Sequence, residues 1–112
     1  MDTETAIGAF AALAQSSRLE AFRLLVRHEP NGLAAGEVAR LLAVPQNTMS
    51  SHLSVLARAG LVTAERSGRT IRYRADLGRL RALMLFFLRD CCDGRAELCG
   101  PLLADLLPAC RP

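Results

Sequence analysis

The sequence predicts a mainly α-helical fold with one small β-hairpin, in the order α-α-α-α-β-β-α. Two observations support this prediction. Apolar residues recur at helical spacing in five segments of the 112-residue chain. Between the fourth and fifth segments, residues 61–66 and 69–75 alternate with the two-residue period of β-strands, and Ser67-Gly68 is expected to form the turn between them.

The first two helices are predicted over residues 3–15 and 17–28. The first is rich in alanine and carries Ile7, Phe10 and Leu13 at helical spacing. Ser17 followed by Glu20 has the spacing of a capping box, so we expect Ser17 to begin the second helix. Glu-Pro-Asn-Gly at 29–32 then interrupts the helical pattern.

The third and fourth helices are predicted on either side of a tight turn at Val44-Pro45. The third runs from about 35 to 42, and its inward residues are expected to be Val38, Ala39, Leu41 and Leu42. The fourth opens with polar side chains and ends at Gly60, a residue that tolerates the left-handed conformation after a helix. Its inner face is expected to be Met49, Leu53, Val55 and Leu56.

The last helix is predicted to begin with Asp76 as its N-cap and to run toward the first cysteines. It is apolar nearly all round: Leu77, Leu80, Leu83, Met84, Leu85, Phe86, Phe87 and Leu88. One chain of this size does not cover such a helix alone. We therefore expect a homodimer in which the first and last helices contact a second copy across a two-fold axis.

Length and composition predict one domain over residues 1–112, with its terminal helices at the dimer interface and a cysteine-bearing tail at 91–112. No basic segment precedes an apolar stretch at the start, and the longest apolar run is too short to cross a bilayer. A cytoplasmic protein without a membrane partner is expected. The net charge of +3 and the pI of about 9.0 favour a nucleic-acid partner.

Two helices joined by a tight turn and followed by a hairpin have the order of a winged helix-turn-helix. The second helix begins with side chains that can reach base edges or phosphates: Gln46, Asn47, Thr48, Ser51 and His52. The hairpin adds basic side chains suited to phosphates or the minor groove: Arg66, Arg69, Arg72 and Arg74. A solvated helix start and a charged edge that prevents aggregation are the alternatives. Because both features occur in the right order, we expect binding to double-stranded operator DNA.

All four cysteines lie beyond residue 90, at Cys91, Cys92, Cys99 and Cys110. In a reducing compartment, this clustering favours metal binding or sensing over a disulfide framework. Paired Cys-x-x-Cys motifs that suit zinc are absent, whereas three sulfurs without a nearby histidine suit trivalent arsenic or antimony. A continuous helix would separate Cys91 and Cys99 by roughly 12 Å, so the helix must end at the cysteine pair, where Asp93-Gly94 follows.

Residues 37–62, EVARLLAVPQNTMSSHLSVLARAGLV, followed by RSGRTIRY at 66–73, resemble the ArsR family of metal- and metalloid-responsive repressors. The resemblance implies a homodimer that binds its operator without inducer and leaves it when inducer binds. The family's Cys-Val-Cys site on the third helix is absent, because Glu37-Val38-Ala39-Arg40 stands there. A zinc site with Asp and His ligands is also absent, because the last helix has no histidine.

What remains is similar to the subgroup with an adjacent cysteine pair at the end of the last helix and a third cysteine soon after. This resemblance implies that Cys91, Cys92 and Cys99 bind arsenic(III) or antimony(III) as inducer, with no organic cofactor and no enzymatic activity. One rival is a redox-sensing repressor that pairs Cys91 or Cys92 with Cys99 or Cys110. Another is a small thiol enzyme or metalloid-delivery protein without DNA, which the absence of a paired base and the basic hairpin disfavour.

Overall fold

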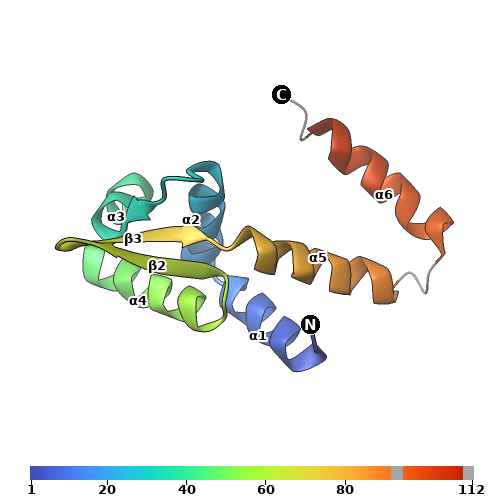
Figure 1. The fold of residues 1–112 in the computed structure, drawn as a ribbon, viewed down its shortest axis with the longest axis horizontal. Coiled ribbons are helices and arrows are strands. Elements are labelled where there is room, and N and C mark those ends of the chain that lie inside the picture. Colours follow the sequence, from blue (N-terminus) through green and yellow to red (C-terminus); the bar gives the residue numbers. More distant parts are fainter. Residues whose placement is uncertain (92–94, 110–112) are drawn as a thin grey trace.

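The structure is a computed structural model and describes residues 1–91 and 95–109. Within these residues there are six helices and a three-stranded antiparallel sheet (Figure 1). The elements are α1 (Thr3–Leu13), α2 (Ser16–Arg27), β1 (Leu33–Ala34), α3 (Ala35–Leu42), α4 (Gln46–Arg58), β2 (Val62–Ser67), β3 (Thr70–Ala75), α5 (Leu77–Cys91) and α6 (Ala96–Ala109). Helices α5 and α6 extend away from the sheet (Figure 1). The predicted mainly helical, winged helix-turn-helix class is confirmed, whereas β1 and α6 were not predicted.

Helix α1 packs on the body of the protein through its small residues. Asp2 is its N-cap and accepts a hydrogen bond from the Thr5 amide at 2.7 Å. The side chain of Thr5, followed by this amide, lowers the pKa of the Asp2 carboxyl. The buried residues of α1 are Ala6, Ala9 and Ala12. Ile7 and Phe10 are exposed, whereas Leu13 is partly buried against the core of this chain.

Helix α2 begins at Ser16, and the expected capping box at Ser17 is wrong. Gln15 is the N-cap, because its Oε1 accepts a hydrogen bond from the Arg18 amide at 2.8 Å. The Arg18 Nε also donates to the carbonyl oxygen of Ala12 at 2.6 Å, which fixes the corner between α1 and α2. Glu20, the expected capping partner, lies 3.6 Å from Arg23 instead.

The turn between α3 and α4 depends on a left-handed residue. Ala43 ends α3 with φ +55°, and the Val44 amide then donates to the carbonyl oxygen of Ala39 at 3.0 Å. Val38, Ala39, Met49, Leu53 and Leu56 are buried, as predicted. Leu41 is 52% exposed, so its predicted inward position is wrong; it lies on the solvent side of the short helix.

Strand β3 lies in the centre of the sheet, between β1 and β2. In the hairpin, Ser67 pairs with Thr70, so the turn residues are Gly68 and Arg69, one position later than expected. Gly68 takes φ +64°, a conformation that glycine adopts without steric cost. Strand β1 pairs Leu33 with Tyr73 and joins the hairpin to the helical body.

Helix α5 follows β3 after a single residue, Asp76, whose carboxylate accepts a hydrogen bond from the Arg79 amide at 2.9 Å, as predicted for an N-cap. Leu83 on α5 is fully buried. The phenyl rings of Phe10 and Phe87 meet edge to face with centroids 6.0 Å apart, and this contact joins α1 to α5. The described part of α5 runs to Cys91, and the predicted end of the helix at the cysteine pair involves residues outside the described ones.

Helix α6 replaces most of the predicted cysteine-bearing tail. Together with α1 and α5 it encloses an apolar hollow of about 340 Å³, lined by Phe10, Met84, Phe87, Leu88, Leu102 and Leu106. Helix α6 and the hairpin tip lie at opposite ends of the molecule (Figure 1). In the part of the chain that the structure describes, the helices fall short of the length and apolarity that a bilayer crossing requires.

Candidate nucleic-acid interface

Helix α4 is anchored by one face and presents the other to solvent. Met49, Leu53 and Leu56 are fully buried, whereas Asn47 and Thr48 on the first turn are exposed. The N-cap is Pro45, which supplies no side-chain oxygen, and the first turn contains no acidic residue. The positive end of the α4 dipole is therefore not neutralised by a carboxylate of its own first turn, an arrangement that is compatible with an anionic partner.

The predicted base-reading residues follow one another along this open face. Gln46, Asn47, Thr48 and Ser51 are exposed and His52 is half-buried. Asn47 Oδ1 accepts a hydrogen bond from the Thr48 amide at 2.9 Å, and the Ser51 hydroxyl donates to the carbonyl oxygen of Asn47 at 3.3 Å. The Asn47 amide nitrogen therefore keeps donor capacity toward an external partner.

The four arginines of the hairpin divide into two pairs. Arg66 near the end of β2 and Arg69 in the turn are exposed. Across residues 1–91 and 95–109, neither has an acidic partner within ion-pair distance. Arg72 and Arg74 on β3 have partners within the chain. The four arginines, which the sequence analysis treated alike, therefore lie in two different environments.

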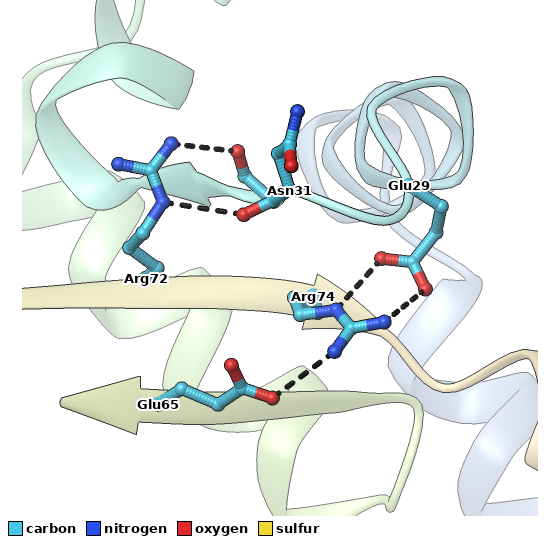
Figure 2. Close-up of polar contacts among 6 residues, drawn as sticks. Glu29, Asn31, Glu65, Arg72 and Arg74 are labelled. Atoms are coloured by element: carbon cyan, nitrogen blue, oxygen red, sulfur yellow. Dashed lines mark hydrogen bonds and ion pairs between the residues drawn. The ribbon is translucent and has the colours of Figure 1, made fainter. Parts of the chain in front are cut away.

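Figure 2 shows how Arg74 lies between two carboxylates. Its Nε and Nη2 donate to Glu29 at 3.1 and 3.2 Å, and its Nη1 donates to Glu65 at 3.2 Å. The hydrogen bonds and charge of Glu29, followed by those of Glu65, raise the pKa of Arg74. Because Glu29 follows α2 and Glu65 is on β2, Arg74 joins the hairpin to the helical body.

Arg72 makes a second connection of the same kind (Figure 2). Its Nε and Nη2 donate to the carbonyl oxygens of Asn31 and Gly32 at 3.2 and 3.1 Å, and Nη2 lies 3.9 Å from Glu37. Gly32 has φ +72°, and a Cβ there would lie 2.5 Å from the carbonyl oxygen of Tyr73. The loop can therefore approach β3 this closely only with glycine at residue 32.

These connections determine the charge of the surface. Arg72 and Arg74 lie against Glu29, Glu37 and Glu65, and so offset carboxylates that would otherwise repel an anion. Arg66 and Arg69 remain as the exposed, uncompensated charges of the hairpin. The sequence did not reveal the acidic partners, because Glu29 is 45 residues from Arg74 and only folding brings them together.

The cysteines lie at the other end of the molecule. Cys91 is the last residue of α5, and Cys99 lies in the first turn of α6. Cys92 and Cys110 fall outside the described residues, as do the side chains of Cys91 and Cys99. The described side chains include no group of three His, Cys, Asp or Glu arranged to hold a metal ion, and the predicted three-sulfur site lies beyond them.

Sequence comparison places a helix-turn-helix domain in the first part of the chain. A family model described as a helix-turn-helix domain matches residues 13–65, from the end of α1 into β2. The HTH-type transcriptional repressor SmtB of Mycobacterium tuberculosis is 53% identical over 38 residues, which are 34% of this chain and 28% of that protein. The matched part thus spans less than a third of the repressor's length.

Solved structures match over most of the chain. An ArsR-like transcriptional regulator from Rhodococcus sp. RHA1 has a TM-score of 0.73 at 28% identity, covering 87% of this chain and 89% of that one. The homodimeric winged helix-turn-helix DNA-binding domain of Mb0332 from Mycobacterium bovis has a TM-score of 0.62 at 29% identity, covering 78% and 81%. A possible transcriptional regulator for arsenical resistance has a TM-score of 0.57 at 32% identity, covering 69% and 80%.

Proposed function

Because the chain belongs to the ArsR family of helix-turn-helix transcriptional regulators, we propose that it is a homodimeric repressor controlled by trivalent arsenic or antimony. It binds operator DNA and leaves it when Cys91, Cys92 and Cys99 bind the metalloid. One observation carries the proposal: α5 directly connects the hairpin, which is proposed to contact DNA, with the first of the cysteines proposed to bind the metalloid. Its first turn follows β3 after Asp76, and its last residue is Cys91.

In this proposal the open face of α4 enters the major groove, with Asn47, Thr48, Ser51 and His52 reaching base edges or phosphates. Arg66 and Arg69 contact phosphates beside it. Arg72 and Arg74 were predicted to contact DNA as well. Their internal hydrogen bonds favour a different contribution, which is to hold the hairpin at a fixed position beside α4.

The homodimer is supported by an apolar surface on α1, α5 and α6. The exposed large residues there are Ile7, Phe10, Leu77, Met84, Phe87, Leu102 and Leu106. Five of them, Phe10, Met84, Phe87, Leu102 and Leu106, line one apolar hollow, and an exposed apolar cluster of this kind is typical of an interface. The similar Mb0332 domain is described as homodimeric. A two-fold dimer places two copies of α4 roughly 34 Å apart, the spacing of successive major grooves.

Inducer capture needs no preformed thiolates. Each of the three thiols releases its proton to one hydroxyl of arsenous acid, three waters leave, and three sulfur–arsenic bonds replace three oxygen–arsenic bonds. Bridging Cys91, Cys92 and Cys99 constrains the end of α5 relative to the start of α6. Because α5 directly follows β3, reorientation of α5 moves the hairpin relative to α4. A coupling free energy of about 1–3 kcal/mol is enough for release of ordinary allosteric size.

A single titration tests the proposal against its rivals. A duplex selected by the purified protein from a random library is bound to the protein, and fluorescence anisotropy is followed with arsenite, with peroxide and with neither. Release by arsenite alone supports the proposal. Release by peroxide alone favours the redox-sensing repressor. Failure to select any duplex favours a thiol protein without DNA function.

Cysteine variants test the ligand set in the same assay. Cys91→Ser, Cys92→Ser and Cys99→Ser should each bind the duplex normally and resist arsenite. Cys110→Ser is the matched control and should respond as the parent does. If Cys99→Ser releases DNA at the parent's arsenite concentration, the three-sulfur assignment is wrong and a site built with Cys110 or shared between subunits replaces it.

A further inference from the structure

A polar cleft separates the start of α3, the start of α4 and the hairpin tip. Its volume is about 350 Å³, and it is lined by Ala34, Ala35, Gly36, Gln46, Ser50, Arg69, Thr70, Ile71 and Tyr73. This volume falls within the range of about 300–1,000 Å³ that is usual for ligand sites. The cleft adjoins the residues proposed to contact DNA, on the same side of the molecule as the hairpin tip.

The polar side chains that line the cleft are hydrogen-bond donors, and none of them is acidic. Arg69 is its only charged residue, and no carboxylate contributes to the lining. Side chains that can donate hydrogen bonds reach it from three elements: Gln46 and Ser50 from α4, Arg69 from the turn, and Thr70 and Tyr73 from β3. Guanidinium, amide and hydroxyl donors are the groups that bind DNA phosphate oxygens. The cleft therefore has the donor chemistry of an anion site with no opposing negative charge.

The position of Gln46 separates it from the rest of the open face of α4. A Cβ built at Gly36 would lie 3.3 Å from Gln46 Oε1, 3.5 Å from its Cδ and 3.6 Å from its Nε2. The Gln46 amide group thus lies against the start of α3, beside the cleft. Because Gly36 has no side chain, the amide group fits there without displacement. Gln46 is among the residues that line the cleft, and Asn47 is not.

We propose that this cleft seats one phosphodiester of each DNA half-site, held by Arg69, Gln46 and Ser50. Gln46 then positions the DNA backbone and does not read a base, which replaces the base-reading role predicted for it from the sequence. The inference rests on the proposed DNA-binding function and adds to it a defined backbone site. Clamping one phosphate between α4 and the hairpin fixes the depth at which α4 enters the groove.

The test compares the selected duplex with a scrambled duplex of the same length, using the full-length protein and fluorescence anisotropy. Gln46→Ala should weaken binding to both duplexes by a similar factor of about tenfold, because it removes a hydrogen bond to a charged group. Gln46→Glu should weaken both more strongly, since a carboxylate would face the phosphate. Asn47→Ala is the matched control and should reduce the preference for the selected duplex, because Asn47 is assigned to base edges.

A chemical probe locates the phosphate. Methylphosphonate substitutions placed one at a time along the selected duplex neutralise single phosphates. At one position per half-site the loss of affinity should be smaller in Gln46→Ala than in the parent, because only the Gln46 contact to that phosphate is already absent, while Arg69 and Ser50 still contact it. If Gln46→Ala lowers affinity for the selected duplex alone, Gln46 reads a base and the cleft assignment is overturned. Unchanged binding to both duplexes overturns it as well. A parent protein that binds neither duplex overturns the proposed function itself.

Discussion

The hairpin and the start of α4 differ from the α5–α6 end of the molecule in how their side chains are accommodated. At the hairpin end, the half-buried Arg72 and Arg74 and the carboxylates beside them are satisfied within the chain. At the other end, Phe87 is 52% exposed and Leu102 and Leu106 are each 46% exposed. At the hairpin end the exposed groups are mainly polar or charged, whereas at the other end the described residues leave large apolar side chains exposed to solvent, as is typical of a surface that binds another molecule. The difference separates the surface proposed for DNA from the surface proposed for the second subunit.

The largest expected effect distinguishes a buried leucine of α5 from an exposed leucine of α3. Leu83→Ala should lower the free energy of unfolding by about 2–5 kcal/mol, because Leu83 is fully buried and its truncation leaves a cavity. Leu41→Ala is the matched control: Leu41 is 52% exposed, so the same substitution should change stability by less than about 0.5 kcal/mol. Urea denaturation measures both. Equal losses would contradict the assignment of Leu83 to the core.

The burial of Leu83 also determines which residue of α5 can test dimerisation. The sequence placed Leu83 and Phe87 together on a nearly uniform apolar helix, but only Phe87 is exposed. Phe87→Asp should raise the dimer dissociation constant by at least about 100-fold, since each subunit loses the burial of one phenyl ring and gains an unpaired carboxylate in the interface. Sedimentation velocity should show a folded monomer, with its helical circular dichroism retained. A dimer that persists at micromolar concentration would contradict the assigned interface.

At the hairpin end, Arg69 and Arg74 should respond differently to substitution. Arg69→Ala should weaken binding to all duplexes by about tenfold and reduce the dependence of log affinity on log salt concentration by about 1 per subunit, because one phosphate contact is lost. Arg74→Gln removes the connection to Glu29 and should lower thermal stability and affinity while leaving the salt dependence close to the parent's. Anisotropy titrations at several salt concentrations measure both. A reduced salt dependence in Arg74→Gln would show that Arg74 contacts phosphate directly.

The parts of the fold that the sequence predicted are those with strong local periodicity. Met49, Leu53 and Leu56 follow helical spacing, and all three are buried. Strand β1 was not predicted because a strand of two residues is too short to show alternation of apolar and polar side chains. Only its pairing with Tyr73 and Arg72 defines it as a strand. Helix α6 was missed because Gly100 and Pro101 lie within it, and both are disfavoured inside helices.

The functional surface was predicted less completely than the fold, for a related reason. A cluster of arginines in the sequence shows charge but not the partners of that charge. Arg74 was grouped with Arg69, although Glu29 binds Arg74 and no carboxylate among the described residues pairs with Arg69. The Gln46 amide was grouped with Asn47 because they are neighbours, and only the packing of α3 against α4 separates the environments of the two side chains.

The smallest expected effect concerns the turn that sets α4 against α3. Ala43 adopts φ +55°, a left-handed conformation that costs an L-residue with a Cβ about 1 kcal/mol or more relative to glycine. Ala43 is exposed, so Ala43→Gly removes no core contact. Glycine's greater freedom in the unfolded chain offsets part of the gain, and the net stabilisation should be at most about 1 kcal/mol.

Urea denaturation of Ala43→Gly should therefore show a small increase in stability, with DNA affinity close to the parent's because the turn keeps its conformation. Ala11→Gly is the matched control: Ala11 is exposed on α1 and has ordinary helical geometry, so glycine there should destabilise by about 0.5–1 kcal/mol. If Ala43→Gly raises stability and Ala11→Gly lowers it, the difference between the two variants is due to backbone conformation alone. If both variants lose stability equally, the left-handed residue does not limit the turn, and the contacts of Val44 with α3 fix the position of α4 instead.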